Sequence, residues 1–286
     1  MRLVTYQSST GPRVAGVRQG MLVDLNLSDA SVPACIKALL AQGPDGLRRA
    51  QEALAAGKAM PAEGIKLLPP IPSPEKVICV GLNYADHAKE GGVEPPPVPV
   101  IFSKFPTTVR AHGDPIVLPR LSKEVDYEAE LVAVIGLGGR HIPEDQARRH
   151  VAAYCCGNDV SARDWQLRKP GGQWLLGKSF DSFAPFGPEL VTADEIPNPN
   201  DLAIQLRLNG RVMQDSSTAQ FLFPVEKLVS YVSGVCTLSP GDVLFTGTPS
   251  GVGFARKPPV FLQPGDVVEV EIHRLGILRN PVVAEA

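Results

Sequence analysis

The sequence has no pair of cysteines spaced as Cys-x-x-Cys, which argues against a structural zinc site. Its five cysteines are an odd, scattered set, and two of them, Cys155 and Cys156, are adjacent. Such a set is typical of reduced thiols rather than of a disulfide framework. Reduced thiols fit the cytoplasm or an organelle matrix, and we expect a cytoplasmic protein.

Long apolar runs and runs of basic residues are also missing. Nothing in the chain approaches the length of a transmembrane span, and residues 1–6 lack the apolar centre of a signal peptide. Lys and Arg together number 28 against 30 Asp and Glu, so the formal net charge is −2. This balance offers no electrostatic footprint for nucleic acid or for an anionic membrane, and we expect neither as a partner.

Glycine and proline are plentiful, at 27 and 28 residues, while helical patterns are few. This composition favours short strands joined by tight turns. Asn209-Gly210, between two apolar runs, is the strongest hairpin signal. Helices are expected over residues 31–41, 46–56, 143–154 and 225–235. Together these features predict an α+β fold dominated by β-structure.

A proline-rich segment, residues 68–74, interrupts the chain early. It cannot be a helix or a central strand, because proline lacks the backbone N–H that both require. We interpret it as a linker. The sequence therefore predicts a small N-terminal α+β domain over residues 1–72 and a main domain over residues 73–286.

The stretch from Glu124 to Leu131 alternates acidic and non-acidic residues. As a β-strand it would place the carboxylates of Glu124, Asp126, Glu128 and Glu130 on one face, with neighbours roughly 7 Å apart. Like charges at this spacing repel, so the face is either open to water or holds a cation. An exposed edge strand and a site for Mg²⁺, Mn²⁺ or Ca²⁺ both explain the stretch taken alone.

Two other patches carry residues that could join such a site. Asp159 could cap a helix and pair with Arg163 four residues later, or it could supply a third carboxylate to a metal. His87 and Glu90 are three residues apart and share a face if they lie on a helix. A histidine there is either structural or, with Glu90, part of a pair that activates water as a general base.

One motif is set aside. Residues 172–179 match the phosphate-loop pattern G-x-x-x-x-G-K-[ST] in every letter. No apolar strand precedes them, the two prolines and the glycine of residues 181–188 prevent a following helix, and bulky Trp174 lies where the loop would have to wrap around phosphate. We therefore do not expect nucleotide binding.

Taken in order, the motifs resemble the fumarylacetoacetate hydrolase family over roughly residues 75–286. Any one motif is weak, but the ordered set is very specific. The motifs are Gly81-Leu82-Asn83-Tyr84 with His87 and Glu90, Asp126-Tyr127-Glu128-Ala129-Glu130, Asn158-Asp159-Val160-Ser161-Ala162-Arg163-Asp164, Gly177-Lys178-Ser179-Phe180-Asp181, Pro240-Gly241-Asp242 and Gly247-Thr248-Pro249-Ser250-Gly251-Val252-Gly253. Within the family the chain looks most similar to the type two proteins that contain a fumarylacetoacetate hydrolase domain. Some of these proteins act on oxaloacetate.

The resemblance implies a β-sandwich roll, usually a homodimer, with a bound divalent metal. By this similarity the metal, Mg²⁺ or Mn²⁺ and less readily Ca²⁺, is held by Glu128, Glu130 and Asp159. Lys178 matches the lysine that stabilises a developing enolate, and His87 with Glu90 matches a catalytic dyad on a lid. Arg163, Gln166 and Thr248 fall at positions assigned to substrate binding. The implied substrate is a small 2-oxo acid.

Three functions follow as hypotheses. The first is a metal-dependent hydrolase that breaks a C–C bond in an acylpyruvate-like, β-diketo acid. The second uses the same site for tautomerisation or decarboxylation of oxaloacetate, which needs enolate stabilisation but no attack by water. The third is a non-catalytic metal-binding or assembly protein. The founding hydrolase of the family uses a further aspartate ligand in a differently arranged loop, which argues against fumarylacetoacetate itself as the substrate.

Overall fold

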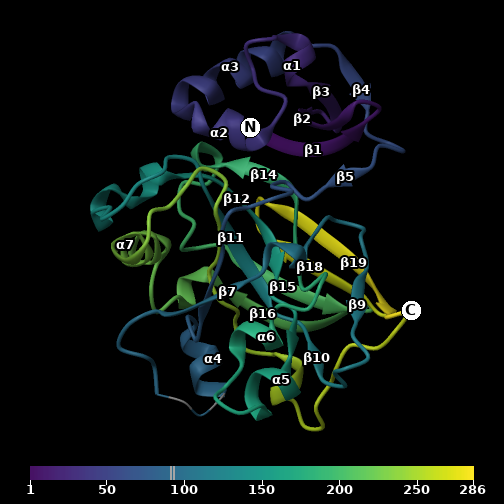
Figure 1. Ribbon diagram of the computed structural model, residues 1–286, viewed down its shortest axis with the longest axis vertical. Coiled ribbons are helices and arrows are strands. Elements are labelled where there is room, and N and C mark those ends of the chain that lie inside the picture. The colour runs from purple at the N-terminus through teal and green to yellow at the C-terminus, as the bar shows by residue number, and fades with distance from the viewer. Residues whose placement is uncertain (91, 93) are drawn as a thin grey trace.

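The computed structural model describes residues 1–90, 92 and 94–286. These residues form two large packed sheets and a separate two-stranded sheet, with helices at their margins (Figure 1). Strands outweigh helices, so the predicted β-dominated α+β class is confirmed. No helix in these described ranges is long and apolar enough to cross a membrane.

The larger sheet extends from the N-terminal end of the molecule to the region of the acidic stretch. Most of its strand pairs are antiparallel, whereas β6 pairs with β17, and β8 with β14, in parallel. In spatial order its strands are β4 (Ala59–Pro61), β3 (Met21–Asp24), β2 (Gly11–Arg18), β1 (Arg2–Ser8), β14 (Ala184–Thr192), β12 (Val151–Asn158), β11 (Ala129–Ile135), β17 (Val243–Phe245), β6 (Val77–Gly81) and β7 (Val100–Lys104), with β5 (Leu67–Leu68) beside β1 and β8 (Val109–Arg110) beside β14.

The second sheet packs across β11, β12 and β14, and apolar side chains from both sheets form one buried cluster between them. Its strands, in spatial order, are β16 (Arg211–Ser217), β15 (Ala203–Leu208), β18 (Val267–Ile272), β19 (Gly276–Ala284) and β9 (Ile116–Leu118). The predicted hairpin at Asn209-Gly210 joins β15 to β16, and both residues have positive φ, 53° and 77°. Positive φ at both central positions is what a tight two-residue turn requires.

The helices are mostly short. They are α1 (Leu25–Ser28), α2 (Ile36–Ala41), α3 (Gly43–Ala56), α4 (Ala85–Glu90), α5 (Arg163–Arg168), α6 (Trp174–Gly177) and α7 (Val225–Val235). The helix expected over residues 225–235 is confirmed as α7. The helix expected over residues 143–154 is wrong: residues 144–150 form a 3₁₀ helix, and the chain then enters β12. Every residue of β12 is buried, and pairing with β11 and β14 on its two sides outweighs the local helical signal.

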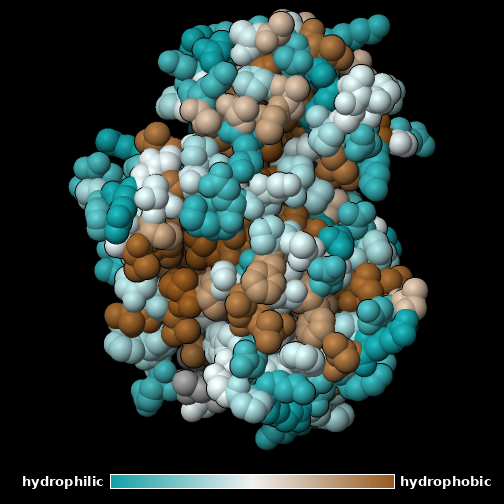
Figure 2. All heavy atoms as spheres, viewed as in Figure 1, coloured by the Kyte–Doolittle hydropathy of each residue, from teal (hydrophilic) through white to brown (hydrophobic). Residues whose placement is uncertain are grey.

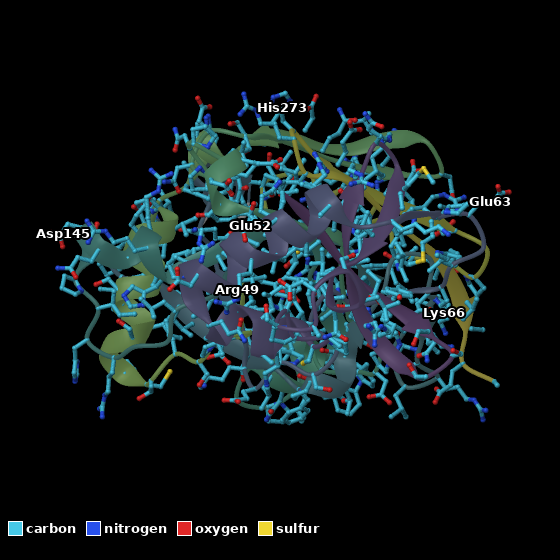
Figure 3. All side chains as sticks on the ribbon, turned by 90° about the horizontal axis from the view of Figure 1, so that it is seen from above. Arg49, Glu52, Glu63, Lys66, Asp145 and His273 are labelled. Carbon is cyan, nitrogen blue, oxygen red and sulfur yellow. The ribbon has the colours of Figure 1, made fainter. Side chains whose placement is uncertain are left out.

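Residues 1–72 lie at the upper end of the molecule in Figure 1. They continue the larger sheet, because β1 pairs with β14 through Leu3 opposite Leu190. One buried apolar cluster contains both Leu3 and Val132 of β11. Seen from above, α3 with Arg49 and Glu52 lies over the body, while charged residues such as Glu63 and His273 lie at the rim (Figure 3). The division into two domains at residues 72–73 stays a prediction.

The acidic stretch is not one continuous strand. Val125–Asp126 form β10, which pairs with β13 (Ser161–Ala162), and Ala129 begins β11. Between them the backbone N–H of Glu128 donates to the side-chain oxygen of Asn158 (3.0 Å) rather than to a backbone carbonyl of a paired strand. The prediction that four carboxylates share one solvated or metal-binding face is therefore wrong in part, and the break gives the acidic side chains different surroundings.

Candidate metal centre and active site

The carboxylates of Glu128, Glu130 and Asp159 lie together, with one oxygen from each within 4.8 Å of the others. Glu130 is on β11, and Asp159 follows β12, the strand paired with β11. The backbone N–H of Asp159 donates to the carbonyl of Glu128 (2.9 Å), which holds the end of β12 against the break before β11. All three side chains are buried. The arrangement that the resemblance implied for these residues is therefore spatially consistent with a metal centre, although their role as ligands stays a prediction.

Three basic side chains surround two of these carboxylates. The Lys178 ammonium bridges Glu128 Oε2 (2.7 Å) and Asp159 Oδ2 (2.8 Å). Arg163 lies 2.6 Å from Glu128 Oε1, and the buried Lys104 donates to Asp159 Oδ1. Burial raises the pKa of Glu128, but Lys178 and Arg163 outweigh this effect and lower the pKa to about 2. Burial lowers the pKa of Lys178, yet the charges of Asp159 and Glu128 raise it above its usual value, so this side chain stays an ammonium.

Glu130 is placed differently. Its Oε2 accepts a hydrogen bond from the backbone N–H of Gly247 (2.8 Å), and within the described ranges no basic side chain pairs with it. Burial, together with the charges of Asp159 and Glu128, raises its pKa well above the usual range. A buried carboxylate in this position is stabilised by a cation or by a proton. Three converging carboxylates fit a divalent ion with a preference for oxygen ligands, such as Mg²⁺ or Mn²⁺.

A cavity of about 290 Å³ adjoins this cluster at Glu128, the one member of the triad among its lining residues. Glu128 and Lys178 reach its floor, and His87, Arg163, Gln166 and Thr248 line it. Much of the remaining wall is apolar, from Val80, Leu82, Phe102, Leu167, Trp174 and Phe254. Larger grooves of about 570 Å³ occur beside α3 and between β7 and α7, but none of the three carboxylates lines either. The cavity over Glu128 is therefore the candidate active site.

His87 enters this cavity from α4. Its Nδ1 lies 3.3 Å from Glu90 Oε2, and Glu90 Oε1 accepts a hydrogen bond from the backbone N–H of Gly251 (2.9 Å). Asp86 accepts hydrogen bonds from Ser216 and Ser250, so it ties α4 to the same loop. The predicted pairing of His87 with Glu90 on one helix is present, and only His87 lines the cavity.

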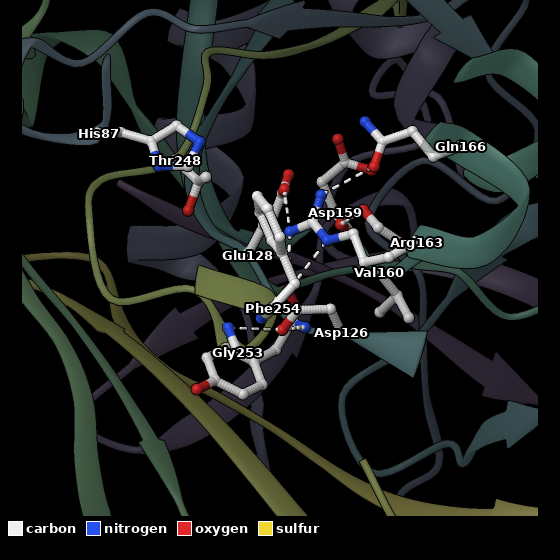
Figure 4. A network of polar contacts seen from close by, with 12 residues as sticks. His87, Asp126, Glu128, Asp159, Val160, Arg163, Gln166, Thr248, Gly253 and Phe254 are labelled. Atoms are coloured by element: carbon white, nitrogen blue, oxygen red, sulfur yellow. Dashed lines mark hydrogen bonds and ion pairs between the residues drawn. The ribbon is translucent and has the colours of Figure 1, made fainter. Parts of the chain in front are cut away.

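Arg163 occupies the centre of the polar network in Figure 4. Besides Glu128 it contacts Asp126 Oδ2 (2.9 Å) and Gln166 Oε1 (2.9 Å), and its guanidinium lies over the ring of Phe254. The structure shows no contact of Arg163 with Asp159, and Asp159 caps no helix, so the alternative of a cap with an ion pair is not what forms. Asp126 also accepts the backbone N–H groups of Gly253 and Phe254.

Two acids of the alternating stretch lie outside the triad. Asp126 pairs with Arg163, and Glu124 pairs with the exposed Arg168. Thr248 accepts a hydrogen bond from Gln214 (2.8 Å) and presents its side chain at the cavity wall. The predicted substrate-binding residues Arg163, Gln166 and Thr248 are therefore gathered in one place, and their role stays a prediction.

Sequence reasoning missed Lys104 and Trp174. Lys104 ends β7, an outer strand, where a lysine in the sequence usually indicates a solvated edge, and nothing in the pattern points to Asp159. Trp174 lies in the segment that matched a phosphate loop, and the structure instead places it in α6, at the cavity wall. The element directly before α6 is the helix α5, not a strand.

Comparison with known proteins identifies the family of this chain. Residues 76–283 match the model of the fumarylacetoacetate (FAA) hydrolase C-terminal domain. The chain belongs to the fumarylacetoacetate hydrolase family. A curated relative from Xenopus laevis, named "Oxaloacetate tautomerase fahd2, mitochondrial", is 49% identical over 288 residues, which cover 99% of this chain and 90% of the relative. This similarity confirms the resemblance to the domain-containing type two proteins.

Solved structures agree with this assignment. The fumarylacetoacetate hydrolase from psychrophilic Exiguobacterium antarcticum superimposes with a TM-score of 0.86 and 36% identity, covering both chains completely. The maleylpyruvate hydrolase from Sphingobium sp. SYK-6, in complex with manganese(II) and pyruvate, gives a TM-score of 0.83 and 28% identity, again over both complete chains. The chain is therefore an enzyme of this family, and the hypothesis of a non-catalytic assembly protein is not supported.

The expected cytoplasmic location is contradicted. The Xenopus relative is named a mitochondrial protein, and further relatives from human and cattle carry the same designation. Reduced cysteines are as compatible with an organelle matrix as with the cytoplasm, so they did not discriminate between the two locations.

Proposed function

We propose that this enzyme interconverts the keto and enol forms of a 2-oxo acid, with oxaloacetate as substrate and Mg²⁺ or Mn²⁺ as cofactor. One arrangement carries the proposal. Lys178 and one member of the acidic triad, Glu128, are hydrogen-bonded to each other and line the cavity, and His87 lines it as well. A cation for a developing oxyanion and a base for a carbon-bound proton are what enolisation needs. The near full-length similarity to an oxaloacetate tautomerase supports the choice of substrate.

A divalent ion held by Glu128, Glu130 and Asp159 would supply Lewis-acid polarisation of the 2-oxo group. Lys178 keeps its proton, because neighbouring carboxylates raise its pKa. It therefore serves as a hydrogen-bond donor to the oxygen on which negative charge grows. His87 removes the proton from C3, and a proton returns at the 2-oxygen, so the reaction is balanced without a co-reactant.

Glu90 orients the base in this scheme. A proton on His87 Nδ1 is held by Glu90, which leaves Nε2 unprotonated and available to accept the C3 proton. The hydrogen bond from Gly251 to Glu90 fixes the carboxylate in turn. Gln166, Thr248 and Arg163, which all line the cavity, are proposed to bind the substrate.

Hydrolytic cleavage of an acylpyruvate-like β-diketo acid is the second candidate. The apolar side of the cavity, formed by Leu82, Phe102 and Trp174, favours it because an acyl group would pack there. In this reaction the His87–Glu90 pair would activate water for attack on the distal carbonyl. Decarboxylation of oxaloacetate would need the same enolate stabilisation and no water.

One experiment separates these reactions. Purified protein with Mg²⁺ or Mn²⁺ is mixed with freshly dissolved enol oxaloacetate, with keto oxaloacetate and with acetylpyruvate, and products are followed by proton NMR and by loss of enol absorbance. We expect faster keto–enol exchange of oxaloacetate with little pyruvate formed. Acetate and pyruvate from acetylpyruvate, with no effect on the exchange, would replace tautomerisation by hydrolysis. The Glu128→Gln/Glu130→Gln variant is the control and is expected to show neither activity.

We also propose that the enzyme forms a homodimer through the surface made by Ile101 of β7 with Tyr231 and Val235 of α7, here named the α7–β7 face. All three side chains are exposed, Val235 by 75%, and an apolar groove of about 570 Å³ lies between the two elements. Figure 2 shows apolar side chains gathered over this region. Contact with a second copy would remove this surface from water.

A further inference from the structure

Each carboxylate of the triad has at least one oxygen already engaged by the protein. Gly247 N–H occupies Glu130 Oε2, and Arg163 lies against Glu128 Oε1. For Asp159, Oδ1 accepts from the Lys104 ammonium. The other oxygens of Glu128 and Asp159, Oε2 and Oδ2, both accept from the Lys178 ammonium, so one oxygen of each of these two acids converges on a single cation.

Lys104 is an unusual partner for this purpose. Its side chain is completely buried, and its ammonium donates to Asp159 Oδ1 and to the backbone carbonyl of Val160 (2.9 Å). It reaches this position from the end of β7, on the side of Asp159 away from Lys178, which binds Oδ2. A lysine is rarely buried without a specific partner, and here the partner is one oxygen of a proposed metal ligand.

We propose that Lys104 is a positioning residue that holds Asp159 as a single-oxygen ligand, so that the centre favours Mg²⁺ or Mn²⁺ over Ca²⁺. This inference rests on the proposed metal centre. Mg²⁺ demands octahedral geometry and short bonds, whereas Ca²⁺ takes six to eight oxygens and often binds both oxygens of one carboxylate. With Oδ1 tied to Lys104, Asp159 cannot offer the second oxygen that the larger ion would use.

Selectivity, rather than affinity, is the quantity that reports this role. Removing the Lys104 charge strengthens the attraction of the site for any divalent cation. The same change frees the Asp159 carboxylate to move, which weakens the binding of the cation. These effects oppose each other in the affinity for one ion. Because Mn²⁺ and Ca²⁺ carry equal charge, the Coulomb contribution largely cancels in the ratio of their dissociation constants, and coordination geometry remains.

The test is isothermal titration of metal-free full-length protein with MnCl₂ and with CaCl₂. We expect the unaltered protein to bind Mn²⁺ at least about tenfold more tightly than Ca²⁺, and Lys104→Met to lower that ratio by about tenfold, the lower end of the effects seen when a partner of a metal ligand is removed. Lys104→Arg keeps a cation that can donate to Oδ1 and is expected to keep the ratio.

Lys76→Met is the matched control. Lys76 pairs with the buried Asp242 at 3.0 Å and contacts none of the three proposed ligands, so its loss is expected to lower thermal stability without changing the ratio. An unchanged ratio in Lys104→Met would overturn the role of Lys104 alone. If that variant does not fold, equal affinities of the unaltered protein for both ions would overturn it. No binding of Mn²⁺ to the unaltered protein would overturn the proposed metal centre itself.

Discussion

At the scale of single residues, the candidate site depends on a balance of buried charges. Asp126, Glu128 and Asp159 pair with Arg163, Lys104 and Lys178, whereas none of these three cations pairs with Glu130. With Glu130 ionised, these four acids and three cations would carry a net excess of one negative charge. A divalent cation would reverse the sign and attract an anionic 2-oxo acid.

Lys178→Met removes the ammonium that bridges Glu128 and Asp159. We expect kcat for oxaloacetate tautomerisation to fall about 100-fold or more, since donors aimed at a developing oxyanion contribute at least this much. Stopped-flow loss of enol absorbance with saturating Mg²⁺ measures the rate, and circular dichroism checks that the variant folds. A folded variant with the rate of the unaltered protein would exclude Lys178 from catalysis.

Glu130→Gln is expected to abolish metal binding and yet to stabilise the metal-free protein. The substitution removes a buried carboxylate without a cationic partner and keeps an oxygen for the Gly247 N–H, so the free energy of unfolding should rise by about 1 kcal/mol. Urea unfolding with a chelator present measures it. Glu144→Gln, at a side chain that is about half exposed, serves as the control. A loss of stability in Glu130→Gln would mean that Glu130 is well compensated without a metal.

At the scale of elements, single strands and helices decide which side chains meet. Asp126 lies before the break between β10 and β11 and stays outside the triad, whereas Glu128, within the break, and Glu130, after it, gather with Asp159. The alternating sequence pattern contains no sign of this break, because it depends on Asn158 of β12 binding the Glu128 backbone. Likewise, the segment after Pro143 has local helical features, and only its two neighbouring strands make it β-structure from Val151 onward.

Asp24 joins several elements at the N-terminal end. Its carboxylate caps α1 through the Leu27 N–H (2.8 Å) and accepts from Tyr6 of β1 (2.6 Å) and Arg13 of β2 (2.9 Å). We expect Asp24→Ala to lower the free energy of unfolding by about 2–3 kcal/mol, because it removes charge-assisted hydrogen bonds and the cap together. Urea unfolding tests this. Asp45→Ala on α3, where the acid is 80% exposed, should change little.

The same carboxylate should make stability sensitive to acid. Burial raises the pKa of Asp24, but hydrogen bonds from Arg13, Tyr6 and Leu27 outweigh it and leave the pKa below the usual value of 3.8. The stabilisation is therefore complete above about pH 4 and is lost as the pH falls through the lower folded value. Urea midpoints between pH 6 and pH 2.5 should fall less steeply in Asp24→Asn than in the unaltered protein. Parallel curves would contradict the argument.

At the scale of the whole molecule, one sheet and one apolar cluster connect residues 1–72 with the body. The site lies in the body, and the α7–β7 face lies on its side (Figure 1). The site contains no residue from the N-terminal part. The N-terminal residues therefore contribute to the fold rather than to the chemistry that we propose.

The proposed dimer can be tested on the α7–β7 face. Val235→Glu places a charge where an apolar contact with a second copy is expected, so we predict that a dimer in the unaltered protein becomes a monomer. Sedimentation equilibrium measures the mass. Leu27→Glu is a matched control, because Leu27 is also about three-quarters exposed, at 77%, but lies on α1. A dimer that survives Val235→Glu with unchanged affinity would place the interface elsewhere.

The sequence alone determined the class of fold, the hairpin at Asn209-Gly210, α7 and the family, because these depend on local turn chemistry, periodicity and ordered motifs. The same motifs named Glu128, Glu130, Asp159, Lys178 and His87. Only the tertiary structure decided that the acidic stretch breaks before β11, that residues 151–158 form a strand, and that Lys104 lies behind Asp159. The reason is physical: a buried charge is stabilised by whichever partner the fold brings to it, and Lys104 and Asp159 are 55 residues apart in the chain.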